Sequence, residues 1–175
     1  MNMKIKIVYS NYYLDEITLT MLDISKKQLK NHRIDFDIVG VPGSFEIPYE
    51  IARSIKEDTI NNQSQTESFK GKDKEKIRDN IVQMAKLSQL NLNNQPIYSG
   101  YLALGCIIKG KTINHQAIST AIFTNLQRIS VENTTPIGNG IFNANDMKEA
   151  KKKFNKCTYH AVETLLLLLQ NEKKK

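Results

Sequence analysis

The sequence predicts a single α/β domain built on a parallel sheet with helices on both faces. β-forming segments alternate with segments whose apolar residues have helical spacing, along most of the chain. Residues 97–108, which read IYSGYLALGCII, suit a strand that is buried on both faces of a parallel sheet. A chain of 175 residues suits one domain. These observations favour a three-layer sandwich, in which helices cover a parallel sheet.

Each element has a local signal. The β-rich run 4–9 opens the chain, and residues 14–31 then place Ile17, Met21, Ile24 and Leu29 at helical spacing. The next strand stops at a Pro-Gly pair, after which helical spacing resumes. In order, we predict strand 4–9, helix 14–31, strand 36–41, helix 45–56, strand 97–108, helix 116–131, strand 136–142, and helices at about 146–153 and 159–170.

The alternation is lost in residues 57–95. This stretch contains NNQSQTES, KGKDKEK and LSQLNLNNQ, with one short amphipathic patch at 77–87. Such polar composition buries little apolar surface. We therefore expect one domain over 1–175 that carries an exposed insertion at about 57–95.

Charge and composition narrow the function classes. The formal net charge is +7, but the lysines concentrate in the 70s, in 151–153 and in the tail, without aromatic stacking platforms. This distribution favours a basic solvated surface over a nucleic-acid site, and it leaves open a basic pocket for a phosphorylated small molecule. Cys106 and Cys157 lack metal-ligand spacing, so we expect neither a disulfide nor a bound metal.

Nothing in the sequence indicates a membrane. The N-terminal MNMKIKIVYS is too short and mixed for a signal peptide, and the longest apolar run, 165–169, is far below membrane-spanning length. We expect a soluble, cytoplasmic protein.

The chemistry should lie at the carboxyl ends of the strands, where parallel α/β sheets bind their ligands. Four segments follow strands directly: residues 10–13, 41–46, 109–115 and 139–143. The third belongs to the run GCIIKGKT, which satisfies the P-loop pattern G-x-x-x-x-G-K-[ST]. A P-loop needs a flexible turn between its glycines, whereas Cys106, Ile107 and Ile108 are β-formers that continue the strand. A nucleotide-hydrolysing P-loop is therefore the weaker reading.

Two of these segments carry candidate binding groups. Gly110, Lys111 and Thr112 lie between a strand end and a helix N-terminus, which forms either an anion site or an ordinary capped turn. In VPGSFEIP, the Pro-Gly turn presents the backbone of Ser44 and the carboxylate of Glu46. Glu46 either accepts hydrogen bonds from ligand hydroxyls or only faces the helix dipole.

Two ordered motifs resemble those of the lumazine synthase family. VPGSFEIP is similar to the family's VPG-[AS]-FE-[IL]-P, and ALGCIIKGKT is similar to its ALG-x-[VI]-I-[RK]-G-x-T. VYSNYY, TPIGNGIFNANDMKEAKKK and NKC follow in the expected order. The resemblance implies a flavodoxin-like sandwich. It also implies that the protein is an enzyme, a transferase of riboflavin biosynthesis, and that this enzyme forms 6,7-dimethyl-8-ribityllumazine without a cofactor. Its substrates are 5-amino-6-(D-ribitylamino)uracil and 3,4-dihydroxy-2-butanone 4-phosphate.

The same resemblance implies roles for individual residues. The uracil substrate would be held by Tyr12, Ser44, Phe45, Glu46, Cys106, Ile107, Ile108 and Asn139. The phosphate would be bound by Lys111, Thr112 and Lys153, and Lys156 matches the lysine of the family's NKG. Lys153 and Asn139 would come from a neighbouring subunit, because family sites form between subunits of a homopentamer. The sequence leaves open whether pentamers stack into larger shells, and we expect no nucleic-acid or membrane partner.

This chain departs from the family pattern at the position of the catalytic histidine. The family's proton-shuttling histidine lies two residues after the threonine, where this chain has Asn114, and His115 follows. Asparagine cannot transfer protons in this way. Either the turn lets His115 serve, which we favour, or the chain is a catalytically impaired relative that binds flavin or lumazine or is only structural. Asn139 replaces an aromatic residue, and Lys153 replaces an arginine that could grip phosphate with two hydrogen bonds.

Overall fold

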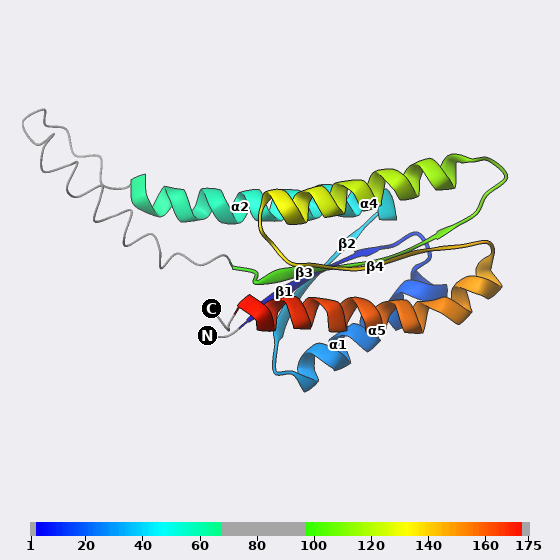
Figure 1. The fold of residues 1–175 in the computed structure, drawn as a ribbon, viewed down its shortest axis with the longest axis horizontal. Coiled ribbons are helices and arrows are strands. Elements are labelled where there is room, and N and C mark those ends of the chain that lie inside the picture. Colours follow the sequence, from blue (N-terminus) through cyan, green and yellow to red (C-terminus); the bar gives the residue numbers. More distant parts are fainter. Residues whose placement is uncertain (1–2, 68–96, 173–175) are drawn as a thin grey trace, which may run out of the picture. The chain divides into compact units, whose positions relative to one another are not determined.

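The computed structural model describes residues 3–67 and 97–172 (Figure 1). By its internal contacts the chain forms two compact units, of which the first comprises Met1–Ala52 with Tyr98–Lys175 and the second comprises Arg53–Ile97. All strands of the described residues belong to the first unit. The first unit therefore carries the sheet and the candidate site.

The first unit contains a parallel sheet of four strands in the order β2-β1-β3-β4. The strands are β1 (Lys4–Ser10), β2 (Asp35–Val41), β3 (Gly100–Ile108) and β4 (Ile137–Ala144). The register places Val8 of β1 between Val39 of β2 and Ala103 of β3. Every residue from Gly100 to Ile107 is buried, which confirms the prediction of a strand enclosed on both faces.

Helices cover both faces of this sheet. The helical elements are the π turn η1 (Leu14–Thr18), α1 (Leu19–Asn31), the 3-10 turn η2 (Ser44–Glu46), α2 (Ile47–Glu67), α4 (Asn114–Glu132) and α5 (Met147–Glu172). α1 and α5 pack together on one face, and α4 with the first residues of α2 lies on the other (Figure 1). The predicted three-layer α/β fold is confirmed.

The main core lies between the sheet and the α1–α5 layer. Its fully buried members come from β1, β3 and both helices, and include Ile5, Ile7, Leu29, Leu102, Leu104 and Leu165. Burying each such side chain contributes about 1.5–3 kcal/mol to folding stability relative to leaving it exposed. The packing of this layer therefore holds β1 and β3 in place. Among the described residues, no helix combines the length and the apolar composition that crossing a bilayer requires.

α2 extends further than the sequence indicated. We predicted loss of order from residue 57, but the helix continues to Glu67. Residues 57–67 contain neither glycine nor proline, so nothing in them terminates a helix. Arg53 Nη1 donates to Glu57 Oε1 at 2.7 Å one turn later, which supports the helix at this point. The remainder of the expected insertion, 68–95, lies outside the described residues.

The C-terminal part of the chain is one helix, where we predicted two. α5 runs without a break from Met147 to Glu172. Asn155 and Lys156 lie between the two predicted helices, and they are exposed on a helix whose opposite side is buried. Thr158 is fully buried there, and its hydroxyl donates to the carbonyl of Phe154 at 2.7 Å. The helix continues because Phe154 and Cys157 pack against the core at this point and the buried Thr158 hydroxyl has its partner within the helix.

Candidate functional site

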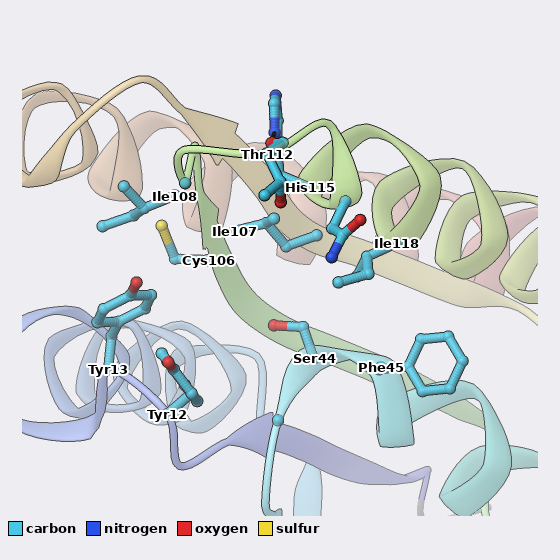
Figure 2. A pocket seen from close by; sticks show the side chains of 13 residues that line it. Tyr12, Tyr13, Ser44, Phe45, Cys106, Ile107, Ile108, Thr112, His115 and Ile118 are labelled. Atoms are coloured by element: carbon cyan, nitrogen blue, oxygen red, sulfur yellow. Dashed lines mark hydrogen bonds between the residues drawn. The ribbon is translucent and has the colours of Figure 1, made fainter.

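A cavity of about 370 Å³ opens at the carboxyl ends of β1 and β3. From β1 the sheet extends to β2 on one side and to β3 on the other, so this is the point where the strand order reverses. Figure 2 shows its walls, which come from the segments after β1 and β2, the end of β3 and the start of α4. The lining residues are Tyr12, Tyr13, Gly43, Ser44, Phe45, Cys106, Ile107, Ile108, Gly110, Thr112, Asn114, His115 and Ile118.

The glycine-rich pattern after β3 does not form a P-loop. Gly105 lies inside β3, paired with Ile141 of β4, and the strand continues to Ile108. The segment between the two glycines is therefore extended, and it does not wrap around a phosphate. A Cβ at Gly105 would lie only 2.5 Å from Ser44 Oγ, so glycine permits the close approach of β3 to the turn after β2.

Ser44 places an unpaired hydroxyl in the cavity wall. The residue is 7% exposed, and its Oγ has no hydrogen-bond partner within the described part of the chain. In Figure 2 this hydroxyl points away from Phe45, toward the side of the cavity where Cys106 and Tyr12 lie. A buried polar atom without a partner costs about 1–3 kcal/mol. A ligand that hydrogen-bonds Ser44 would recover that free energy.

His115 lies in the first turn of α4, at the rim of the cavity. Its Nδ1 is 3.0 Å from the carbonyl oxygen of Thr112. Because a carbonyl oxygen only accepts, Nδ1 must carry the proton, and Nε2 of the neutral ring is left as a proton acceptor. The ring points away from Ser44 (Figure 2). Asn114 lines the same wall, so both candidate positions are present at the cavity.

The first turn of α4 is tied to the edge strand β4. The buried Ser119 hydroxyl lies 2.7 Å from the carbonyl oxygen of His115 and 2.7 Å from Asn143 Oδ1. A hydroxyl has one proton and donates to one of these oxygens at a time. The contact fixes the backbone that carries His115.

Cys106 forms part of the wall as a thiol. Burial, and secondarily the nearby Cys157, raise the pKa of Cys106 to about 12. The side chain therefore carries no charge at neutral pH and is unsuited to nucleophilic attack. Its contribution is an apolar surface.

Five residues implied by the resemblance do not line this cavity: Glu46, Lys111, Asn139, Lys153 and Lys156. Asn139 is exposed on β4, and its Oδ1 accepts a hydrogen bond from the backbone N–H of Ile141 at 3.0 Å.

Lys153 makes its contacts within its own chain. It forms an ion pair with Glu149, and its Nζ lies 3.4 Å from the carbonyl oxygen of Asn143. The hydrogen bond from Lys153 lowers the pKa of Glu149 to about 2, and the same bond raises the pKa of Lys153. Both groups are therefore charged at neutral pH.

The sequence did not identify every residue of the wall. Tyr13, Gly43 and Gly110 line the cavity within the segments 10–13, 41–46 and 109–115 that were expected there, although Tyr13 and Gly43 were assigned no role of their own. Ile118 lies outside those segments, in α4. Within residues 3–67 and 97–172, no cluster of three or more histidine, cysteine or acidic side chains is arranged to hold a metal ion.

Comparison with known proteins identifies the family. The model of the family described as 6,7-dimethyl-8-ribityllumazine synthase matches residues 2–65 and 79–171, which include every residue of the cavity wall. The enzyme of that name from Afipia carboxidovorans is 28% identical over 147 residues, which are 84% of this chain and 69% of the relative. The one from Bartonella bacilliformis is 26% identical over 149 residues, 85% of this chain and 74% of the relative. With matches over most of its length, the chain belongs to the 6,7-dimethyl-8-ribityllumazine synthase family.

Proposed function

We propose that this protein condenses 5-amino-6-(D-ribitylamino)uracil with 3,4-dihydroxy-2-butanone 4-phosphate to form 6,7-dimethyl-8-ribityllumazine. Phosphate and two water molecules leave, no cofactor takes part, and the reaction is the penultimate step of riboflavin biosynthesis in the cytoplasm. The observation that carries the proposal is the cavity at the strand-order reversal, where the buried and unpaired Ser44 hydroxyl meets the residues of both family motifs.

The uracil substrate is assigned to the wall formed by the segments after β1 and β2. Tyr12 is 72% exposed and Phe45 is 59% exposed, so each offers an aromatic face that a planar ring would cover. Ser44 would hydrogen-bond the substrate, and Glu46, in the same turn, would accept hydrogen bonds from ribityl hydroxyls. The backbone from Cys106 to Ile108 would line the pyrimidine edge.

The phosphate is assigned to the start of α4. Ile113 precedes this helix and provides no side-chain cap, which leaves backbone N–H groups available to an anion. Thr112 lies at that point of the cavity wall, and Lys111 is exposed beside it. The helix dipole and the lysine charge both favour a bound phosphate.

A neighbouring subunit would complete the site. Asn139 and Lys153 lie outside the cavity of their own subunit, which supports their placement against the cavity of a neighbour. We propose a homopentamer in which Lys153 reaches the neighbour's phosphate. Lys156 would support the same contact. Because lysine is a point charge, its grip on phosphate is weaker than that of a bidentate arginine.

His115 is the proposed proton carrier. The contact between Nδ1 and Thr112 leaves Nε2 as a base, and Asn114 in the adjacent position has no group that can take this role. The ring would have to turn toward the cavity when substrate binds, which the rim position permits. General acid–base catalysis of this kind contributes about 100- to 10,000-fold to the rate.

The test is a steady-state assay with both substrates, following lumazine absorbance and fluorescence over the non-enzymatic background. We expect saturable product formation by the wild-type protein and a fall in kcat of at least about 100-fold for His115→Ala. His160→Ala is the matched control, because His160 is an exposed histidine on α5 that does not line the cavity. Equal kcat for His115→Ala and wild type would exclude His115 from the mechanism.

The second candidate function is a non-catalytic relative that binds lumazine or flavin. It is favoured by one observation, the outward direction of the His115 ring combined with asparagine at position 114. The same assay separates the two candidates. Product formation at the background rate, together with saturable binding of 6,7-dimethyl-8-ribityllumazine, would support the non-catalytic protein.

A further inference from the structure

Tyr13 lies in the cavity wall, where its phenol group has no established role. The side chain is half-buried, and its hydroxyl points toward Cys106 and Ile108, across the cavity from Phe45 (Figure 2). Within the described part of the chain, no residue hydrogen-bonds this hydroxyl. A polar group thus faces a largely apolar wall, in the way that ligand cavities place their few orienting groups.

Three hydrogen bonds hold the backbone carbonyl group of Tyr13. Its carbonyl oxygen accepts hydrogen bonds from Ile17 N at 3.1 Å, from Thr18 N at 3.0 Å and from Thr18 Oγ1 at 3.3 Å. These donors belong to the π turn η1, and π turns are frequent at functional sites. Thr18 is fully buried, so the anchoring residue is itself fixed.

The ring of Tyr13 is also constrained from its side. Tyr12 packs against it edge to face, with ring centroids 4.8 Å apart and an interplanar angle of 78°. Burial, followed by the charge of Tyr12 when ionised, raises the pKa of Tyr13 above its usual value of 10.0. The hydroxyl is therefore protonated at neutral pH and available as a donor. A donor fixed before binding loses little conformational entropy when a ligand arrives.

We infer that Tyr13 is a substrate-contacting residue, whose hydroxyl donates a hydrogen bond to an oxygen or nitrogen acceptor on the edge of the planar heterocycle. The inference rests on the proposed function and deepens it. Tyr13 serves the ring substrate and not the phosphate, because it follows β1 and the uncapped helix start that suits an anion belongs to α4. Tyr12 offers a ring face and Tyr13 an edge contact, so the adjacent tyrosines would recognise two features of one ligand.

The test compares Tyr13→Phe with wild type in fluorescence titrations with 6,7-dimethyl-8-ribityllumazine. This variant keeps the ring, its packing on Tyr12 and the backbone contacts, and it removes only the hydroxyl. We expect Kd to rise about 3- to 10-fold, the loss of one neutral hydrogen bond. Tyr159→Phe is the control, because Tyr159 is 46% exposed on α5 and does not line the cavity. Inorganic phosphate, titrated as a competitor of the phosphate substrate, should bind both variants like wild type.

The outcomes separate this inference from the proposed function. Equal Kd values for wild type and Tyr13→Phe, with the lumazine bound by both, would overturn the inference and leave the function standing. No saturable binding of lumazine or of the uracil substrate by wild type would overturn the function first. A rise in Kd for Tyr159→Phe as large as that for Tyr13→Phe would show that the effect is not local, and would also overturn the inference.

Discussion

Two regions of this fold differ in whether their polar side chains are paired with other groups of the protein. Under β1, a group that we call the Lys6 cluster pairs its charges internally, and it comprises Lys4, Lys6, Asp37, Glu50 and Tyr98. Lys6 Nζ lies 3.0 Å from Glu50 Oε1, with both side chains 8% exposed. The Tyr98 hydroxyl donates to Asp37 at 2.6 Å, and Lys6 Nζ lies 5.5 Å from the centre of the Tyr98 ring.

At the carboxyl ends of the strands, two polar side chains have no hydrogen-bond partner among the described residues. The Ser44 hydroxyl is buried without a partner, and the Tyr13 hydroxyl is held in place without one, among the described residues. The two regions therefore differ in whether their polar groups find partners within the described part of the protein. Under the proposed function, the Ser44 and Tyr13 hydroxyls would find theirs in a ligand.

Breaking the Lys6 cluster should have the largest effect. Glu50→Ala leaves the Lys6 ammonium buried without its carboxylate, which costs about 3–5 kcal/mol of unfolding free energy. Urea unfolding at fixed protein concentration measures this loss, because self-association would otherwise change the apparent stability. The double variant Lys6→Met/Glu50→Leu is the control and should recover most of the stability. A loss below about 1 kcal/mol for Glu50→Ala would mean that the pair is not desolvated.

An intermediate effect is expected where β3 meets the turn after β2. Gly105→Ala brings a methyl group to 2.5 Å from Ser44 Oγ, so the Ser44 side chain must rotate away or the turn must move, at a cost of about 1–3 kcal/mol. Lumazine binding should weaken at least about 10-fold, because the turn carries both Ser44 and Phe45. At Gly110 an added Cβ meets no atom within 4 Å, so Gly110→Ala is the matched control for the unfolding measurement. Equal losses of unfolding free energy in the two variants would refute the steric explanation.

The smallest effect should also be the most informative. Ser44→Ala removes an unpaired hydroxyl, so the unliganded protein should lose no stability and is expected to gain up to about 1 kcal/mol. Lumazine binding should nevertheless weaken about 3- to 10-fold. Ser25→Ala is the contrast, since the buried Ser25 hydroxyl donates to the carbonyl of Met21 at 2.9 Å and its loss should destabilise the protein. Destabilisation by Ser44→Ala, measured by the same urea titration, would show that the hydroxyl is already satisfied.

The fold was largely predictable because its signals are local. Residues 100–107 form an unbroken apolar run, which is typical of a strand that is buried on both faces of a sheet. The break predicted in α5 was wrong because exposed Asn155 and Lys156 resemble a turn when their neighbours are not known. Residues 57–67 are largely polar yet helical, since helix propensity and i,i+4 contacts can maintain a helix without an apolar pattern in its sequence.

The site was predictable in position but not in detail. Parallel topology brings the segments after β1, β2 and β3 to one edge, so Tyr12, Ser44 and Thr112 converge as expected. The direction of the His115 ring depends on a hydrogen bond to Thr112 that spacing does not encode. The Tyr13 hydroxyl owes its position to a π turn, which differs from an α-helical turn by one residue and has no clear sequence signature.

α5 packs directly against the sheet. Gly138 of β4 brings the strand so close to the helix that a Cβ there would lie 2.6 Å from the carbonyl oxygen of Ala161. Lys153 lies eight residues earlier on the same unbroken helix, roughly 12 Å along its axis. The close contact at Gly138 therefore fixes the distance along α5 between this point of the sheet and the Lys153 ammonium group.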